Sequence, residues 1–129
     1  GPIRIHCVPA QHFCGRSLTD GNHRLWAGWV VQGPTRRFYH AGDTGLFYDM
    51  KLIGEEGNDL ALLPIGDNFT MGPEDALRAV RRISPKRVIP IHYNTFDVIK
   101  QDPHRGAAEV EKQTGVKAIV LNPGEHVEL

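Results

Sequence analysis

The chain has 129 residues, enough for one domain with a moderate hydrophobic core. Its 15 basic residues balance its 15 acidic residues, so no net charge favours a nucleic acid or an anionic membrane surface as partner. Apolar runs such as Leu60 to Ile65 are far shorter than the roughly 20 residues that cross a bilayer. Composition therefore excludes a transmembrane segment and gives no support to a nucleic-acid partner.

The two cysteines and the first residues bear on compartment and completeness. Cys7 and Cys14 are too few for a dense disulfide framework, so a reducing, cytoplasmic compartment is the simpler expectation. Peripheral membrane association and secretion stay open. The start Gly1-Pro2, without Met or a signal peptide, is typical of a trimmed chain end, and we expect further sequence upstream.

The first third of the chain predicts strands. Segments at Ile3 to Val8 and Leu25 to Val31 are strand-like and are separated by a polar loop. The turn at Gln32 to Thr35 predicts a hairpin that leads into a third strand at Arg37 to Ala41. We expect Trp26 and Trp29, three positions apart, on opposite faces of the second strand, with one of them in the core.

From Arg37 onward, short apolar segments alternate with segments of helical period. We expect helices at 46–55, 73–83 and 103–114, and strands at 59–65, 87–91 and 117–121. Pro90 inside the strand at 87–91 predicts an irregular or edge position. The order, a β-hairpin followed by βαβαβαβ, predicts an α/β layered fold and one domain over residues 1–129.

Three residues with metal-binding side chains follow predicted strands. Asp43 follows the strand at 37–41, His92 directly follows the strand at 87–91, and His12 follows the first strand. Ligands of α/β sheets bind outside the carboxyl ends of strands, and one carboxylate with two imidazoles suits zinc or a similar divalent metal. A structural interpretation stays open for each: a turn or cap acid, a histidine bonded at a strand end, and an exposed loop residue.

The other candidate ligands have weaker support. The chain contains no His-x-His or His-Glu-x-x-His pair, so we expect structural or exposed roles for the remaining histidines, His6, His23, His40, His104 and His126. Cys14 lies two residues after His12, but a thiol with no ligand role is the simpler interpretation. Phe69 and Met71, in the loop before the second helix, either pack in the core or line a substrate pocket.

Six segments together resemble the metallo-β-lactamase superfamily. They are PAQHF at 9–13, LWAGWVV at 25–31, FYHAGDTG at 38–45, DLALLPIG at 59–66, MGPEDA at 71–76 and IPIHYNTF at 89–96. The nearest likenesses within it are the UlaG-like metal-dependent hydrolases and the phospholipase D that hydrolyses N-acyl-phosphatidylethanolamine. The resemblance covers nearly the whole chain, with the segments in the expected order.

The resemblance implies a fold, a cofactor and roles for the three candidate ligands. The superfamily domain is an αββα sandwich of two similar halves, and this chain resembles the C-terminal half. Its acid in the AGDTG segment bridges two metal ions, which implies Asp43 as the bridge, His12 as a ligand of the first metal and His92 of the second. The implied metal is zinc, dinuclear in the intact domain, with manganese as the other candidate. Thr44, after the acid, is expected to support its loop by hydrogen bonds.

The implied reaction is hydrolysis, with Asp43 and His92 as the catalytic residues. In the superfamily the ions activate a shared water as hydroxide for attack on a phosphodiester, an ester or a lactone. The substrate would be a small molecule or a lipid of that kind. The family signature His-x-His-x-Asp-His belongs upstream and is absent here. One histidine for each ion plus a bridging carboxylate is too few to hold two ions, since a catalytic zinc ion keeps about three protein ligands. We therefore expect a hydrolase fragment that is inactive unless the missing half is supplied.

Two alternatives to the fragment interpretation stay open. In the first, a second copy of the chain replaces the missing half, because half a sandwich leaves an apolar sheet face exposed to water. In the second, the inherited fold serves as a non-catalytic binding or interaction module, and any metal is incidental. The number of metal ions retained per chain at a known oligomeric state separates these alternatives.

Overall fold

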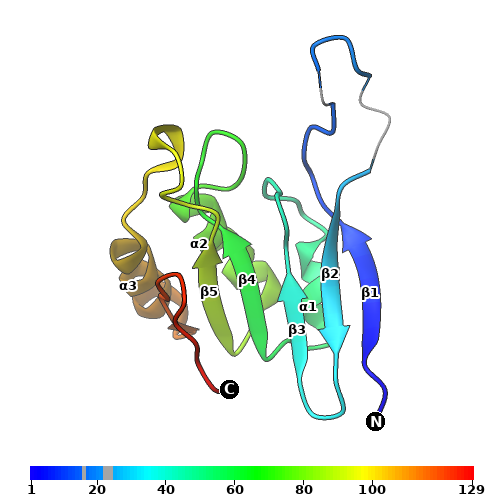
Figure 1. Ribbon diagram of the computed structural model, residues 1–129. Coiled ribbons are helices and arrows are strands. Elements are labelled where there is room, and N and C mark those ends of the chain that lie inside the picture. The colour runs from blue at the N-terminus through cyan, green and yellow to red at the C-terminus, as the bar shows by residue number, and fades with distance from the viewer. Residues whose placement is uncertain (16, 22–24) are drawn as a thin grey trace.

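The computed structural model describes residues 1–15, 17–21 and 25–129 (Figure 1). Six strands form one sheet: β1 Arg4–Pro9, β2 Ala27–Gln32, β3 Arg37–His40, β4 Leu60–Pro64, β5 Arg87–Ile91 and β6 Lys117–Ala118. The helices are α1 Met50–Glu55, α2 Pro73–Ile83 and α3 Pro103–Thr114, with a short 3-10 turn, η1, at Asp97–Ile99. This is the expected α/β class.

The strand order in the sheet follows the order in the chain, β1 to β6. Strands β1, β2 and β3 pair antiparallel, and β3 to β6 pair parallel, each parallel connection carrying a helix. The expected hairpin followed by alternating strands and helices is therefore confirmed. Within the described ranges, no helix is both long and apolar enough to cross a bilayer.

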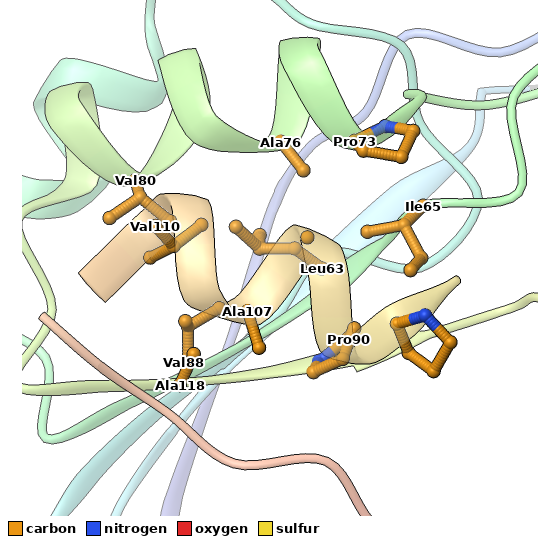
Figure 2. A pocket seen from close by; sticks show the side chains of 12 residues that line it. Leu63, Ile65, Pro73, Ala76, Val80, Val88, Pro90, Ala107, Val110 and Ala118 are labelled. Atoms are coloured by element: carbon orange, nitrogen blue, oxygen red, sulfur yellow. The ribbon is translucent and has the colours of Figure 1, made fainter. Parts of the chain in front are cut away.

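All three helices pack against one face of the sheet. Paired residues of neighbouring strands share a face, and the row Val30, Tyr39, Ala61 and Val88 faces the helices. The helices contribute Met50 and Ile53 from α1, Ala79, Val80 and Ile83 from α2, and Val110 from α3 to the same core. Figure 2 shows α2 and α3 meeting over β4 and β5. Tyr39 is fully buried here, and burial raises the pKa of its hydroxyl.

The opposite face of the sheet is apolar and partly exposed. Cys7, Trp29 and His40 form one row of paired residues on this face, and Ile5 lies in the next row. Ile5 is 64% exposed and Trp29 is 46% exposed. None of the helices of the described chain covers this face, because all of them contribute to the core on the other side.

Two expected elements differ from the structure, the first helix and the last strand. The first helix begins at Met50 instead of residue 46. Thr44 and Gly45 form hydrogen bonds with neighbouring loops, and residues 46–49 connect them to the helix. The last strand has two residues instead of five. Pro90 explains this: the Ile119 amide still donates to the Val88 carbonyl, but Pro90 has no N–H for the next bond of the ladder. Pro90 thus has the edge-like position that its residue type predicts.

The expectation that one tryptophan lies in the core is wrong. Trp26 precedes β2 and is 42% exposed, and Trp29 lies on the uncovered face. The core position of β2 is taken by Val30, which is 1% exposed. Sequence alternation gives the two faces of a strand but not which of them the helices cover.

Candidate metal centre

The candidate ligands lie at the edge of the sheet formed by the carboxyl ends of β1, β3, β4 and β5, at the top of Figure 1. Four segments leave the strands at this edge: the described residues that follow β1 (10–15, 17–21 and 25–26), and the loops at 41–49, 65–72 and 92–102. Such an edge collects loops and side chains from distant parts of the sequence around a common crevice. Asp43 and His92 stand on the second and fourth of these segments.

Asp43 is presented by a loop that is fixed on both sides of it. Gly42 before it has φ 66°, a left-handed conformation that glycine adopts without strain. Thr44 after it is fully buried, and its Oγ1 accepts from the Gln11 amide at 2.9 Å and donates to the Gly45 carbonyl at 2.8 Å. The expected supporting role of Thr44 is thus visible as hydrogen bonds. The Asp43 side chain itself stays 44% exposed.

His92 lies directly after β5 in a strained conformation. Its φ is 56°, a left-handed value that costs a residue with a Cβ about 1–2 kcal/mol. A Cβ added at Gly66 would collide with the His92 carbonyl oxygen and lie 3.2 Å from Nδ1, so a glycine at 66 is what admits this backbone. Nδ1 is buried and has no hydrogen-bond partner among the described residues. The next residue, Tyr93, is half-buried, and burial raises its pKa.

Asp43 and His92 meet in a geometry that fits two ligands of one metal ion. His92 Nε2 lies 3.6 Å from Asp43 Oδ1, too long for a good hydrogen bond. Two donor atoms about 2.1 Å from a tetrahedral zinc ion are about 3.4 Å apart. The residue types and the separation together fit a divalent metal.

His12 is held near this pair but not in it. The Gly45 amide donates to the Gln11 carbonyl at 2.7 Å, which ties the His12 segment to the loop of Asp43. The His12 ring itself packs edge-on against Trp26, with 5.5 Å between ring centroids, and its Nδ1 lies 2.7 Å from the Phe13 carbonyl. Across residues 1–15, 17–21 and 25–129, no three His, Cys, Asp or Glu side chains converge as a metal site.

The secondary candidates divide between core and surface. Cys14 is buried, as is Met71, which is 1% exposed, whereas Phe69 is 63% exposed. The packing interpretation offered for this loop therefore holds for Met71 and not for Phe69, and the substrate-pocket interpretation stays a prediction. Four of the five remaining histidines are exposed, namely His6, His40, His104 and His126. The expectation for His23 lies outside the described residues.

Asn94 and Gly66 shape the His92 loop. For Asn94 the sequence left open a turn role or a contact with the imidazole or the substrate, and for Gly66 sequence reasoning missed the role. Asn94 has φ 60°, its amide donates to the Ile99 carbonyl at 2.9 Å, and its Oδ1 accepts from the Gln101 amide at 2.8 Å. Gly66 is needed for the close approach of His92. A usable signal was present, since asparagine and glycine are the residues that take left-handed or crowded backbone positions.

The comparison with known proteins identifies the family. Residues 1–93 match the family model of the beta-lactamase superfamily domain. The chain belongs to this family. A solved relative also has this fold: YhfI from Bacillus subtilis, a metallo-beta-lactamase fold protein, superposes with a TM-score of 0.74 at 12% identity. The resemblance to the metallo-β-lactamase superfamily is thereby confirmed, while the two finer likenesses within it are not separated.

More similar relatives of this superfamily carry hydrolase names. The chain is 49% identical to the UPF0173 metal-dependent hydrolase of Pelotomaculum thermopropionicum, over 98% of this chain and 58% of the relative. The chain is 54% identical to the UPF0173 metal-dependent hydrolase of Thermus thermophilus, over 95% of this chain and 54% of the relative. Igni18, a metallo hydrolase from Ignicoccus hospitalis, superposes with a TM-score of 0.85 at 40% identity. The superposition covers 97% of this chain and 52% of Igni18. The chain thus spans about half the length of the relatives it matches.

Proposed function

We propose that the intact protein is a metal-dependent hydrolase and that Asp43 and His92 hold part of its metal centre. The observation that carries the proposal is the 3.6 Å separation of His92 Nε2 and Asp43 Oδ1 at the carboxyl edge of the sheet. The names of the relatives support the same class of reaction. A bound divalent ion supplies activation of water and polarisation of the bond under attack.

The side chains have distinct roles in this proposal. The two oxygens of Asp43 let one carboxylate contact two ions, and its exposed side chain leaves these oxygens open to ligands. His92 offers Nε2 to an ion that also contacts Asp43. His12 is assigned to the other ion, which requires its ring to leave Trp26 and the Phe13 carbonyl. Zinc is the proposed metal, with manganese as the alternative, because nitrogen and oxygen donors suit both.

We further propose that residues 1–129 form the C-terminal half of the metallo-β-lactamase-like domain. Two observations support this: the matched relatives are about twice as long, and one apolar sheet face is exposed around Ile5 and Trp29. Only two candidate ligands meet in the described chain. The isolated half is therefore expected to hold metal weakly and to lack activity. A second copy on the same face is the competing arrangement.

The test is metal content measured together with molecular mass. The intact protein and the isolated 129-residue chain are dialysed and passed over a sizing column, and each peak is assayed for zinc and manganese. We expect at least about one ion per intact protein, lost in Asp43→Ala and retained in the control Asp49→Ala, whose side chain makes no cap bond.

Each other result has a definite meaning. An intact protein that hydrolyses its substrates without metal contradicts the proposed function. Metal in a dimer of the isolated chain favours reconstitution by a second copy over the half-domain. Metal in the intact protein alone supports the half-domain, because the remaining ligands then come from the other part of the polypeptide.

A further inference from the structure

Two loops beside the candidate metal centre present apolar side chains to solvent. Phe69 is 63% exposed on the loop after β4, and Phe96 and Val98 are 68% and 55% exposed on the loop after β5. Met71 and Ile99, in the same loops, are each 1% exposed. Each loop therefore anchors one apolar side chain in the interior while it holds others outward.

Hydrogen bonds join the two loops into one ordered unit. The Asn68 side-chain amide donates to the Val98 carbonyl, and Gln101 Nε2 donates to the Gly66 carbonyl at 3.3 Å. Asn68 and Val98 are 30 positions apart in the sequence, so this hydrogen bond links two separate loops. Because the backbones are fixed, a ligand that contacts the exposed side chains has little loop ordering to offset.

The loop after β4 connects the surroundings of the two candidate ligands. Near its start, Gly66 lies so close to His92 that an added Cβ would collide with it; near its end, the Met71 amide donates to the Thr44 carbonyl at 3.0 Å. Thr44 is the residue after Asp43. The exposed middle of the loop therefore stands beside the place where a substrate would be attacked.

The charges of these loops favour an uncharged ligand. Their ionisable side chains are three aspartates, one lysine, Tyr93 and His92 itself. The lysine, Lys100, is already paired with Asp97 at 2.7 Å. Asp102 accepts from two amides at the start of α3. A phosphodiester anion thus finds no available cation on the two loops, whereas an alkyl or aromatic group finds three apolar side chains.

We propose that Phe69, Phe96 and Val98 bind the apolar part of the substrate, and that the substrate is a carboxylic ester or lactone carrying an alkyl or aromatic group. This rests on the proposed function. It narrows the possible substrates from phosphodiesters, esters and lactones to carboxylic esters, of which lactones are the cyclic form. Burial of part of the alkyl group against these side chains contributes binding that grows with chain length. The three residues determine specificity and take no part in the chemical step.

The first test is kinetic and uses the intact, metal-loaded enzyme. Its kcat/KM is measured for p-nitrophenyl acetate, butyrate, hexanoate and octanoate, and for bis(p-nitrophenyl) phosphate. We expect a rise of about twofold per added methylene, which half burial of a methylene group provides. Phe69→Ser and Phe96→Ser should flatten this rise, with the largest loss of kcat/KM for octanoate. The matched control is Leu52→Ser on α1, where the side chain is 60% exposed, and it should keep the wild-type profile.

The second test measures binding without turnover. The intact protein, with 13C-labelled phenylalanine, is titrated with acetate and with octanoate, and the ring signals of Phe69 and Phe96 are followed by NMR. Shifts with octanoate and none with acetate support the proposal. Unresponsive rings overturn it, since they mean that another part of the polypeptide or a second copy covers the patch.

The two tests separate this inference from the proposed function. Ester hydrolysis with a flat chain-length profile, or a preference for the phosphate diester, overturns the apolar site and leaves the metal-dependent hydrolase standing. Hydrolysis of none of these compounds counts against the proposed function, and the octanoate titration then decides the apolar site alone.

Discussion

Two aspartates at opposite edges of the same sheet have opposite environments. Asp59, at the amino end of β4, accepts from Lys86 Nζ at 2.7 Å and from the Arg37 amide at 2.9 Å. The hydrogen bond from Lys86, followed by that from the Arg37 amide, lowers the pKa of this carboxyl group. Asp43, at the carboxyl edge, is 44% exposed, and His92 Nε2 stands 3.6 Å away.

The difference shows how a fold separates a structural acid from a ligand acid. The acceptor sites of Asp59 are used by the protein itself, so this carboxylate joins the starts of three strands. The oxygens of Asp43 accept no hydrogen bond from the described residues, while hydrogen bonds fix the loop around it. A carboxylate on a rigid loop with open oxygens is the arrangement that a metal ligand requires.

The strongest challenge to this comparison is Asp43→Ala. We expect the activity of the intact enzyme to fall by at least about a hundredfold, because loss of even an outer-shell partner of a metal costs about 10- to 100-fold. The free energy of unfolding of the metal-free protein should change by less than about 0.5 kcal/mol, as for other exposed side chains. Turnover assays and urea unfolding measure the two effects.

A stability loss as large as the one expected for Asp59→Asn below would break the comparison, because Asp43 would then be structural as well. Unchanged turnover in Asp43→Ala would remove it from the site altogether.

Gly66→Ala tests whether the strained position of His92 depends on its neighbour. The added Cβ would collide with the His92 carbonyl oxygen and lie 3.1 Å from the Ile99 Cβ. We expect a loss of about 1–3 kcal/mol in unfolding free energy, as for other overpacked sites. Activity should fall by about tenfold or more, because an error of about 1 Å in position is costly to catalysis. A variant with wild-type stability and turnover would show that the His92 loop adjusts freely.

Asp59→Asn tests the structural member of the pair. Its pKa is lowered in the folded state, so its contribution to stability is present above the unfolded pKa of about 3.9 and is lost as the pH falls through the folded value. We expect the variant to be about 1 kcal/mol less stable at pH 7. The difference in unfolding free energy between variant and wild type should shrink as the pH falls. Unfolding midpoints between pH 2 and pH 7 would measure this.

The control for Asp59 is Asp75→Asn, because Asp75 forms an exposed pair with Arg78 at 3.0 Å. Its variant should differ from wild type by less than about 0.5 kcal/mol at every pH. An equal effect in both variants would mean that the loss of stability at low pH comes from the net charge of the protein and not from the hydrogen bonds of Asp59.

The sequence predicted the framework better than the candidate site. Hydrophobic period and turn residues placed the helices and strands because both follow from local chain geometry. The meeting of Asp43 and His92 was expected only as convergence at a sheet edge, since no pattern gives a distance between residues 49 positions apart. The ring contact of His12 with Trp26 could not be foreseen, because it depends on how a long loop packs.

Gly106→Ala is the smallest and most discriminating change. Gly106 lies in α3 beside a cavity of about 30 Å³ between α2, α3 and the sheet (Figure 2). A Cβ there would stand 3.9 Å from the Pro73 Cβ, an ordinary contact, and Gly106 lacks the positive φ that would strain an alanine. We expect a gain of about 0.5–1 kcal/mol, the helix preference of alanine over glycine, with unchanged turnover. Since Gly66→Ala should do the opposite, equal responses at the two glycines would show that the carboxyl edge is no more constrained than the helical layer.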